Sequence, residues 1–161
     1  MSGKTTIGKI LADDKNLNFL DSDTFISRKY SLSLSELIRS RGIEFFRKQE
    51  LKVIKNNISK KSNILSLGGG AVNNKTIEHI VKYRYKIFLQ CEIDTLVDRY
   101  IPSEENRPLL YYTTNIEKKL INYYSEREKY FLDCANIIIQ ADNNSPKYLA
   151  KQISKTIDEI N

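Results

Sequence analysis

The chain begins Ser2-Gly3-Lys4-Thr5-Thr6-Ile7-Gly8-Lys9 after its first methionine. Gly-Lys-Thr is the end of the pattern G-x-x-x-x-G-K-[ST], whose amides and lysine bind phosphates and whose hydroxyl residue binds Mg²⁺. Three residues alone also match by chance, and the alternative is a polar terminus that caps a helix. Ile7, Ile10 and Leu11 follow at helical spacing, which places the tripeptide on the first turn of an amphipathic helix, where amides favour an anion. We therefore expect a phosphate-binding loop here.

Composition indicates one ordinary domain over residues 1–161, with 40% hydrophobic and 29% charged residues. We expect a cytoplasmic location and no membrane partner, because neither a membrane-length apolar run nor a signal peptide is visible. The net charge is +6, but Lys and Arg are interspersed with acids, so we expect an anion-binding pocket and no nucleic acid. Cys91 and Cys134 lack metal-ligand spacing and are expected to be buried, reduced thiols.

Short apolar runs alternate with helical patterns, which predicts an α/β fold with a parallel sheet between helices. The predicted strands span residues 17–20, 64–67, 85–91 and 136–140. The predicted helices span residues 4–13, 33–40, 43–59, 74–82, 93–100, 115–133 and 146–160. The runs at 64–67 and 137–139 are nearly all apolar, as in strands buried on both faces. Ligands of such sheets bind at the carboxyl ends of the strands.

Two carboxylates, Asp21 and Asp23, follow the first predicted strand. One could serve Mg²⁺ and the other a substrate hydroxyl; the alternative is that Asp23 only caps the next helix. Arg47 and Glu50 lie three apart on a predicted helix, so Glu50 could orient the guanidinium toward a carboxylate ligand, or the two could form a surface ion pair.

Three glycines, Gly68, Gly69 and Gly70, follow the strand at 64–67 directly, which indicates close approach of a ligand to backbone amides. Residues 101–114 have weak periodicity and contain Arg107, the pattern of a lid whose arginine closes on a phosphoryl group, or of an exposed loop with an incidental arginine. Arg127 is either a surface cation or a second clamp for a carboxylate.

Together and in this order, these residues resemble shikimate kinase, a small family of P-loop enzymes with the nucleoside-monophosphate-kinase-like fold. The resemblance runs over nearly the whole chain, and its elements are Gly3-Lys4-Thr5-Thr6-Ile7-Gly8, Asp21-Ser22-Asp23, Phe46-Arg47 with Glu50, Gly68-Gly69-Gly70, Arg107-Pro108-Leu109-Leu110 and Arg127. It implies a monomer that transfers the γ-phosphate of ATP to the 3-hydroxyl of shikimate, in the pathway to chorismate and aromatic amino acids.

The resemblance also implies a role for each matched residue. ATP would be held by Ser2, Gly3, Lys4, Thr5, Thr6 and Arg107, with Arg99 and Pro146 as walls of the adenine site. Mg²⁺ would be held by Thr5 and Asp21. Shikimate would be held by Asp23, Arg47, Gly68, Gly69, Gly70 and Arg127, with the two arginines on its carboxylate. Lys4, Asp23 and Arg107 would be catalytic, with Asp23 accepting the proton of the attacking hydroxyl.

The resemblance implies a three-layer α/β/α fold with strand order 2-3-1-4-5, in which strand 1 and the first loop glycine would precede Met1. We expect a gap of roughly 9–10 Å between the flanking strands in this chain. Two alternatives stay open. One is a truncated, catalytically impaired remnant that binds shikimate. The other is a related small-molecule kinase such as gluconate kinase, although the paired arginines fit shikimate better.

Overall fold

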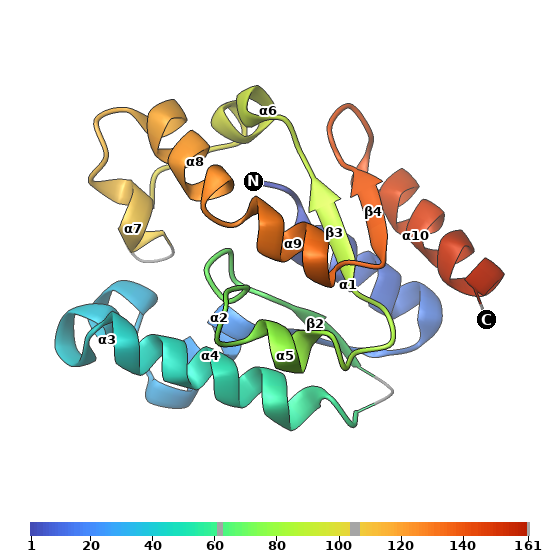
Figure 1. Ribbon diagram of the computed structural model, residues 1–161, viewed down its shortest axis with the longest axis horizontal. Helices are drawn as coiled ribbons and strands as arrows, with labels where there is room; N and C mark the ends of the chain where they lie inside the picture. The colour runs from blue at the N-terminus through green and yellow to red at the C-terminus, as the bar shows by residue number, and fades with distance from the viewer. Residues whose placement is uncertain (61–62, 104–106, 161) are drawn as a thin grey trace.

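A computed structural model describes residues 1–60, 63–103 and 107–160 of the chain (Figure 1). The first half contains α1 (Lys4–Lys15), β1 (Asn18–Asp21), α2 (Ser22–Tyr30), α3 (Leu34–Arg41), α4 (Ile43–Asn57), β2 (Asn63–Ser66) and α5 (Ile77–Ile80). The second half contains β3 (Ile87–Gln90), α6 (Ile93–Asp98), α7 (Pro108–Tyr111), α8 (Ile116–Ser125), α9 (Glu128–Cys134), β4 (Ile137–Gln140) and α10 (Pro146–Ile160). The expectation of an α/β fold is confirmed.

The described strands form two separate parallel pairs. β1 pairs with β2 in the register Asn18↔Asn63 to Asp21↔Ser66, and β3 pairs with β4 in the register Ile87↔Ile137 to Gln90↔Gln140. Within the described residues β2 and β3 are not hydrogen-bonded to each other, so the one continuous sheet suggested by the strand pattern is present as two halves.

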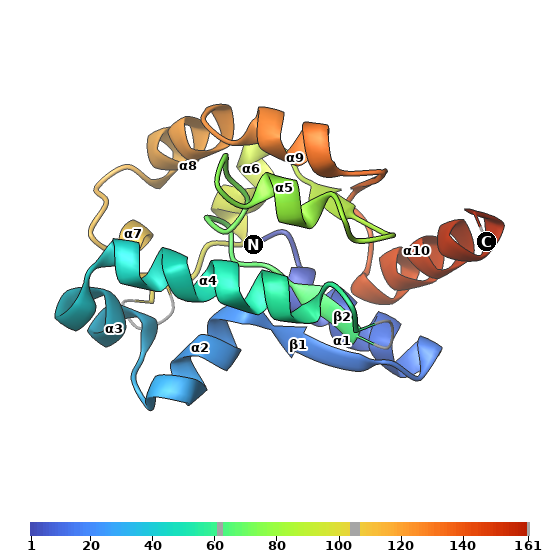
Figure 2. The same ribbon diagram turned by 60° about the horizontal axis from the view of Figure 1, so that its bottom comes forward.

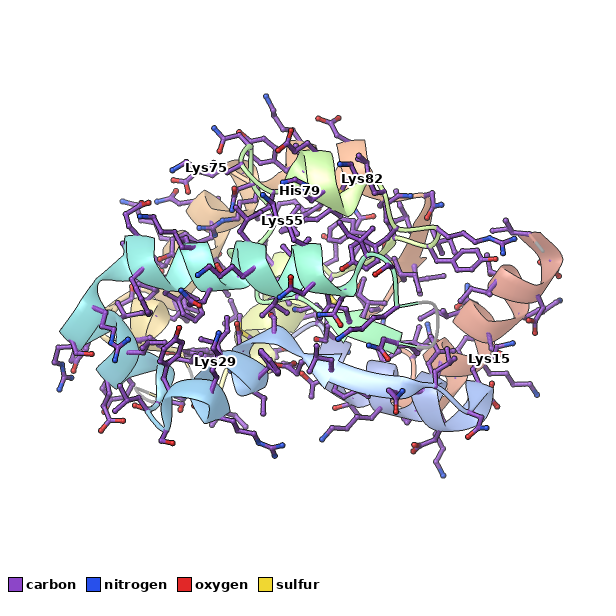
Figure 3. The ribbon with its side chains drawn as sticks, turned by 90° about the horizontal axis from the view of Figure 1, so that it is seen from below. Lys15, Lys29, Lys55, Lys75, His79 and Lys82 are labelled. Atoms are coloured by element: carbon purple, nitrogen blue, oxygen red, sulfur yellow. The ribbon has the colours of Figure 1, made fainter. Side chains whose placement is uncertain are left out.

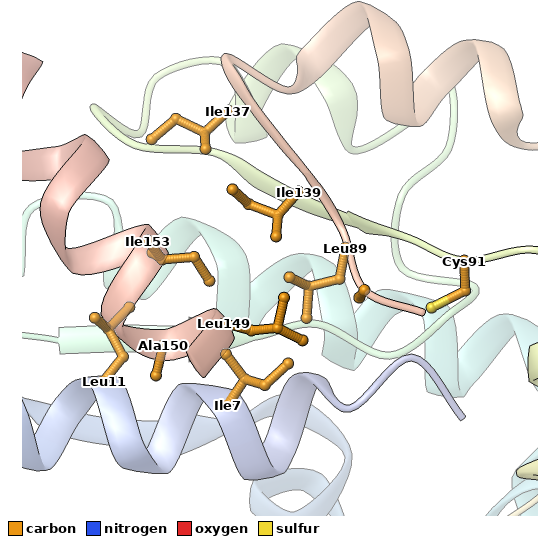
Figure 4. Close-up of a cluster of buried hydrophobic side chains, with 10 residues drawn as sticks. Ile7, Leu11, Leu89, Cys91, Ile137, Ile139, Leu149, Ala150 and Ile153 are labelled. Atoms are coloured by element: carbon orange, nitrogen blue, oxygen red, sulfur yellow. The ribbon is translucent and has the colours of Figure 1, made fainter. Parts of the chain in front are cut away.

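Helices α1 and α10 cover one face of both pairs. Side chains from α1, β3, β4 and α10 build the buried cluster drawn in Figure 4: Ile7, Leu11, Leu89, Cys91, Ile137, Ile139, Leu149, Ala150 and Ile153. Gly8 allows α1 to approach β1, because a Cβ there would lie 2.6 Å from Phe19 Cε2. Lys15 at the end of α1 also pairs with Asp158 of α10 at 2.6 Å, on the side of the molecule seen in Figure 3. This helix pair joins the two strand pairs.

The opposite face is covered by α2, α3 and α4 over one pair and by α9 over the other. Leu20 and Leu65 pack against a cluster that includes Ile26, Phe46 and Val53. Over the other pair, the ring of Phe131 from α9 stacks on Phe88 of β3 with centroids 5.0 Å apart. In the view of Figure 2, the N-terminal end of the chain lies between α4 on one side and α6 and α9 on the other.

Several elements differ from the prediction. Helix α2 was not predicted, because its only two apolar residues before Tyr30, Phe25 and Ile26, are adjacent and show no helical period. The helix predicted at 74–82 shortens to α5, because Thr76 Oγ1 donates to Ala71 O at 2.6 Å and the segment before it forms turns. The helix predicted at 115–133 breaks into α8 and α9 at Arg127.

The lid region, predicted as residues 101–114, contains the short helix α7, and its residues 104–106 lie outside the described part of the chain. The prediction that strand 137–139 is buried on both faces was wrong, since Ile137 and Ile139 are buried but Ile138 is 48% exposed. α10 covers the face of β4 that carries Ile137 and Ile139, whereas Ile138 is on the opposite face. Both cysteines are buried and free, as expected. None of the described helices is long and apolar enough to cross a membrane.

The contact of α1 with α10 gives a stability prediction. Ile153 is 1% exposed inside the cluster of Figure 4, so Ile153→Ala should lower the free energy of unfolding by about 2–4 kcal/mol in urea titrations. Ile160→Ala on the same helix is the control, because Ile160 is 53% exposed and should change stability little. Equal effects of the two substitutions would contradict the packing described for α10.

Candidate functional site

The N-terminal motif and the end of β1 are joined by a side-chain hydrogen bond. Gly3 has a φ of 86°, a left-handed conformation that glycine adopts readily, and leads into α1. Lys4 Nζ donates to Ser2 Oγ at 3.2 Å, and Thr5 Oγ1 donates to Asp21 Oδ2 at 2.9 Å. The first turn of α1 therefore presents backbone amides, an ammonium group and a hydroxyl beside an acidic strand end, an arrangement suited to an anion with a bound cation.

The three side chains of the corner Asp21-Ser22-Asp23 differ in their hydrogen bonding. Asp21 Oδ1 accepts hydrogen bonds from Asp23 N and Thr24 N, both at 3.1 Å, and so caps α2. The alternative that Asp23 provides this cap was wrong. Asp23 Oδ1 is buried and has no hydrogen-bond partner among the described residues. A buried acceptor without a partner is unfavourable, which suggests that this carboxylate is arranged for a ligand.

The glycine turn, residues 68–70, lies against the charged side chains of Asp23 and Arg47. Ser22 is fully buried and its Oγ accepts a hydrogen bond from Gly68 N at 3.0 Å. A Cβ on Gly68 would lie 2.5 Å from Asp23 Oδ1, and a Cβ on Gly70 would overlap the Arg47 guanidinium. A side chain at position 68 or 70 would therefore displace Asp23 or Arg47 from its present place. Gly69 has no atom within 4 Å of the corresponding position, so it is open to a ligand.

Arg47 and Glu50 form an ion pair that is mostly buried. Arg47 Nη1 donates to Glu50 Oε2 at 2.5 Å, and the Glu50 side chain is 1% exposed. The expected pairing is confirmed, while the alternative of a surface ion pair was wrong. Glu50 Oε1 has no partner among the described residues. Burial raises the pKa of Glu50 to about 7, although the Arg47 charge and hydrogen bond act in the opposite direction.

Electrostatic effects join Lys4, Asp21, Asp23 and Arg47 into one cluster. Burial and the Asp21 charge raise the pKa of Asp23, while Lys4 and Arg47 oppose the rise. Lys4 is an exposed residue, but its ammonium group lies among protein atoms, and this desolvation lowers its pKa against the attraction of Asp23 and Asp21. Groups with perturbed pKa values that converge in this way are typical of functional sites.

Arg127 is at the junction of α8 and α9 and faces the same cluster. Its charge lowers the pKa of Glu50, as does that of Arg47, so both arginines act on one carboxylate. Arg127 Nη1 donates to Tyr123 O at 3.4 Å, and its guanidinium carbon lies 4.4 Å from the Tyr123 ring centroid. No acidic residue of the described chain forms an ion pair with Arg127.

Arg107 is the N-cap residue of α7, and its Nη1 donates to Ile101 O at 3.2 Å. Its positive charge contributes to the lowered pKa of Lys4, which relates it to the N-terminal motif. Arg99 donates to Ala141 O and Asp142 O, both at 3.0 Å, and so ties α6 to the loop that leads to Pro146. The predicted site residues thus form a central group, with Arg99 and Pro146 around a separate loop.

Sequence reasoning did not identify two residues that shape the site. In the sequence pattern Ser22 is only the residue between two aspartates, and no motif includes Tyr123. The only signal for Ser22 was a small polar residue at a strand end. A cavity of about 510 Å³ between β1, α2 and α4 is lined by none of the predicted site residues. The side-chain contacts described above, and not this cavity, therefore define the candidate site.

Known proteins resemble this chain over nearly its whole length. The family model described as shikimate kinase matches residues 1–158. The shikimate kinase of Flavobacterium psychrophilum is 38% identical over 97% of this chain and 93% of its own, and that of Colwellia psychrerythraea is 34% identical over 98% and 91%. The solved shikimate kinase of Acinetobacter baumannii in complex with shikimate has a TM-score of 0.91 and 29% identity, covering 98% of this chain and 88% of its own. The chain therefore belongs to the shikimate kinase family of phosphotransferases, which use ATP.

Proposed function

We propose that this chain transfers the γ-phosphate of ATP to the 3-hydroxyl of shikimate, with residues 1–161 acting as a single domain. The observation that carries the proposal is Asp23, a buried carboxylate without a hydrogen-bond partner among the described residues, between Lys4 and Arg47 and against the glycine turn. A relative at 29% identity is described as a complex with shikimate. The two reactants would meet where the N-terminal motif and the glycine turn converge.

Shikimate is a carboxylic acid with ring hydroxyls, and the proposed site supplies groups for both. Arg47 and Arg127 bind the carboxylate, since guanidinium groups form strong charge-assisted hydrogen bonds with carboxylates. Asp23 and the amides of residues 68–70 hold the ring hydroxyls. Asp23 then accepts the proton of the attacking hydroxyl, and its raised pKa brings its basicity closer to that task. Lys4 and Arg107 neutralise charge that develops on the transferred phosphoryl group.

ATP binds at the start of α1 in this proposal, held by Ser2, Gly3, Lys4, Thr5 and Thr6, with Arg99 and Pro146 beside the adenine. Thr5 and Asp21 fit Mg²⁺, because their oxygens lie 2.9 Å apart and Mg²⁺ prefers oxygen ligands. Bound Mg²⁺ would neutralise phosphate charge. The lid carries Arg107 toward the phosphates and excludes water when it closes.

The same proposal includes the finer description of the fold as a three-layer α/β/α structure with strand order 2-3-1-4-5. In this order, β1, β2, β3 and β4 correspond to the strands numbered 2, 3, 4 and 5. Two features support it: the pairs β1–β2 and β3–β4 are parallel, and helices cover both of their faces. The place of strand 1 lies between β2 and β3.

Shikimate-dependent ADP formation from Mg-ATP tests the proposed reaction. Asp23→Asn keeps the shape of the side chain but removes the base, so kcat should fall by about 10²–10⁴-fold. Asp13→Asn at an exposed position of α1 is the control and should leave kcat unchanged. Wild-type chain that binds shikimate but forms no ADP would instead support a binding remnant, and a preference for gluconate would identify a different acceptor.

Substitution of Arg47 tests how the acceptor is recognised. Arg47→Lys keeps the positive charge but loses the planar fork that pairs with a carboxylate and with Glu50. The KM for shikimate should rise by about 10-fold to 100-fold, while the KM for ATP changes little. Lys48→Ala, one residue away and exposed, is the matched control. A rise in the KM for ATP alone would contradict the assignment of Arg47 to shikimate.

Glu50 gives a prediction for stability as a function of pH. Its pKa is raised from 4.5 to about 7, so the folded state holds the proton more tightly than the unfolded state does. This contribution to stability is fully present below the unfolded pKa and is lost as pH rises through about 7. We compare the unfolding free energies of wild type and Glu50→Gln. The wild-type value minus the variant value should fall by up to about 3 kcal/mol between about pH 4.5 and 8.

Chemical denaturation at a series of pH values measures this difference. Glu44→Gln on the same helix is the control, because the Glu44 side chain is 74% exposed. Parallel stability curves for wild type and Glu50→Gln would refute the raised pKa.

A further inference from the structure

Tyr123 of α8 contacts both Arg127 and helix α7. In the proposed function, these two parts of the molecule bind different ligands. Its ring centroid lies 4.4 Å from the guanidinium carbon of Arg127. Its hydroxyl donates to Leu109 O in α7 at 3.4 Å. Arg127 is assigned to the carboxylate of the acceptor, whereas the N-cap residue of α7, Arg107, is assigned to the phosphates of ATP. One side chain therefore lies between the acceptor site and the lid.

The ring of Tyr123 helps to hold Arg127 in place. Arg127 is the cap residue of α9, just beyond the end of α8, and it has no ion pair with an acid of the described chain. Arg127 contacts the face of the Tyr123 ring in a cation–π interaction and donates a hydrogen bond to the Tyr123 carbonyl at 3.4 Å. Neither contact neutralises the positive charge, so Arg127 is positioned but remains able to pair with a carboxylate.

The hydroxyl of Tyr123 acts on the lid. Leu110 N and Tyr111 N both donate to Arg107 O at 3.0 Å, so Arg107 and Leu109 belong to the same turn. Tyr100 holds this turn through a hydrogen bond from its hydroxyl to Leu110 O at 3.2 Å. The position of the Arg107 backbone is thus linked by one helical turn to the hydroxyl of Tyr123.

We propose that Tyr123 is a positioning residue that couples the lid to the acceptor site, so that shikimate and ATP strengthen each other's binding. The inference rests on the proposed function, because it uses the ligands assigned there to Arg127 and Arg107. A carboxylate that fixes Arg127 also fixes the ring beneath it, and the hydroxyl then holds α7 in one position. By linkage, a nucleotide that orders α7 must tighten acceptor binding by the same factor.

The neighbouring residue Tyr124 provides a matched control within α8. Its hydroxyl accepts a hydrogen bond from Gln90 Nε2 of β3 at 3.3 Å, so this hydroxyl points to the strand layer and not to α7. Tyr124→Phe and Tyr123→Phe remove the same atom from adjacent positions. A general effect on folding would appear in both variants, whereas a coupling effect would appear only in the second.

Calorimetry of shikimate binding, with and without a non-hydrolysable ATP analogue and Mg²⁺, measures the coupling directly. In wild type and Tyr124→Phe we expect the analogue to tighten shikimate binding by about 5-fold or more. In Tyr123→Phe, which keeps the ring, shikimate alone should bind as in wild type, but the factor should fall toward 1. Tyr123→Leu, which removes the ring too, should also weaken binding of shikimate alone by about 3-fold to 10-fold.

The outcomes separate this inference from the proposed function. If wild type binds both ligands without mutual tightening, or if Tyr123→Phe keeps the full factor, the coupling role of Tyr123 is wrong while the proposed function stands. If wild type does not bind shikimate at all, the proposed function fails first and the inference falls with it. Loss of the factor in Tyr123→Phe but not in Tyr124→Phe would establish the role.

Discussion

The corner at Asp21-Ser22-Asp23 is the constraint on which the arrangement of the site depends. Two of the three consecutive side chains there have partners: Asp21 caps α2 and accepts from Thr5, and Ser22 accepts from Gly68 N. The third, Asp23, has no hydrogen-bond partner among the described residues. Because Asp21 satisfies the first amides of α2, Asp23 is not needed as a cap. The division of labour leaves one carboxylate available at the meeting point of the N-terminal motif and the glycine turn.

Burial of charge is the second feature that the site requires. Glu50 is 1% exposed and one of its oxygens lacks a described partner, an arrangement that costs stability compared with an apolar side chain of similar shape. The benefit is geometric, since a buried acid fixes the guanidinium of Arg47 at 2.5 Å against the turn at Gly70. A surface acid would hold the same guanidinium less firmly, because water and side-chain entropy would compete with the pairing.

The predictable features are those that depend on neighbours along the chain. The alternating apolar runs identified all four described strands, and the spacing of Arg47 and Glu50 predicted their pairing. The bond between Ser22 and Gly68 joins residues 46 positions apart, so no local pattern signals it. The break at Arg127 was missed because no Gly or Pro marks it. The burial of Glu50 depends on what packs over α4, and a nearby Arg equally suits an exposed pair.

The two arginines assigned to the acceptor are held by chemically different means, and this difference has consequences. Arg47 is held by an acid whose pKa is about 7, so its partner changes charge near neutral pH. Arg127 is held by an aromatic face and a backbone carbonyl. A ligand carboxylate must compete with Glu50 for Arg47 but meets no described acid at Arg127. In the proposed function, Arg127 therefore offers the acceptor a guanidinium without an ion-pair partner among the described residues, while Arg47 contributes direction, and Tyr123 contacts the arginine that no described acid pairs with.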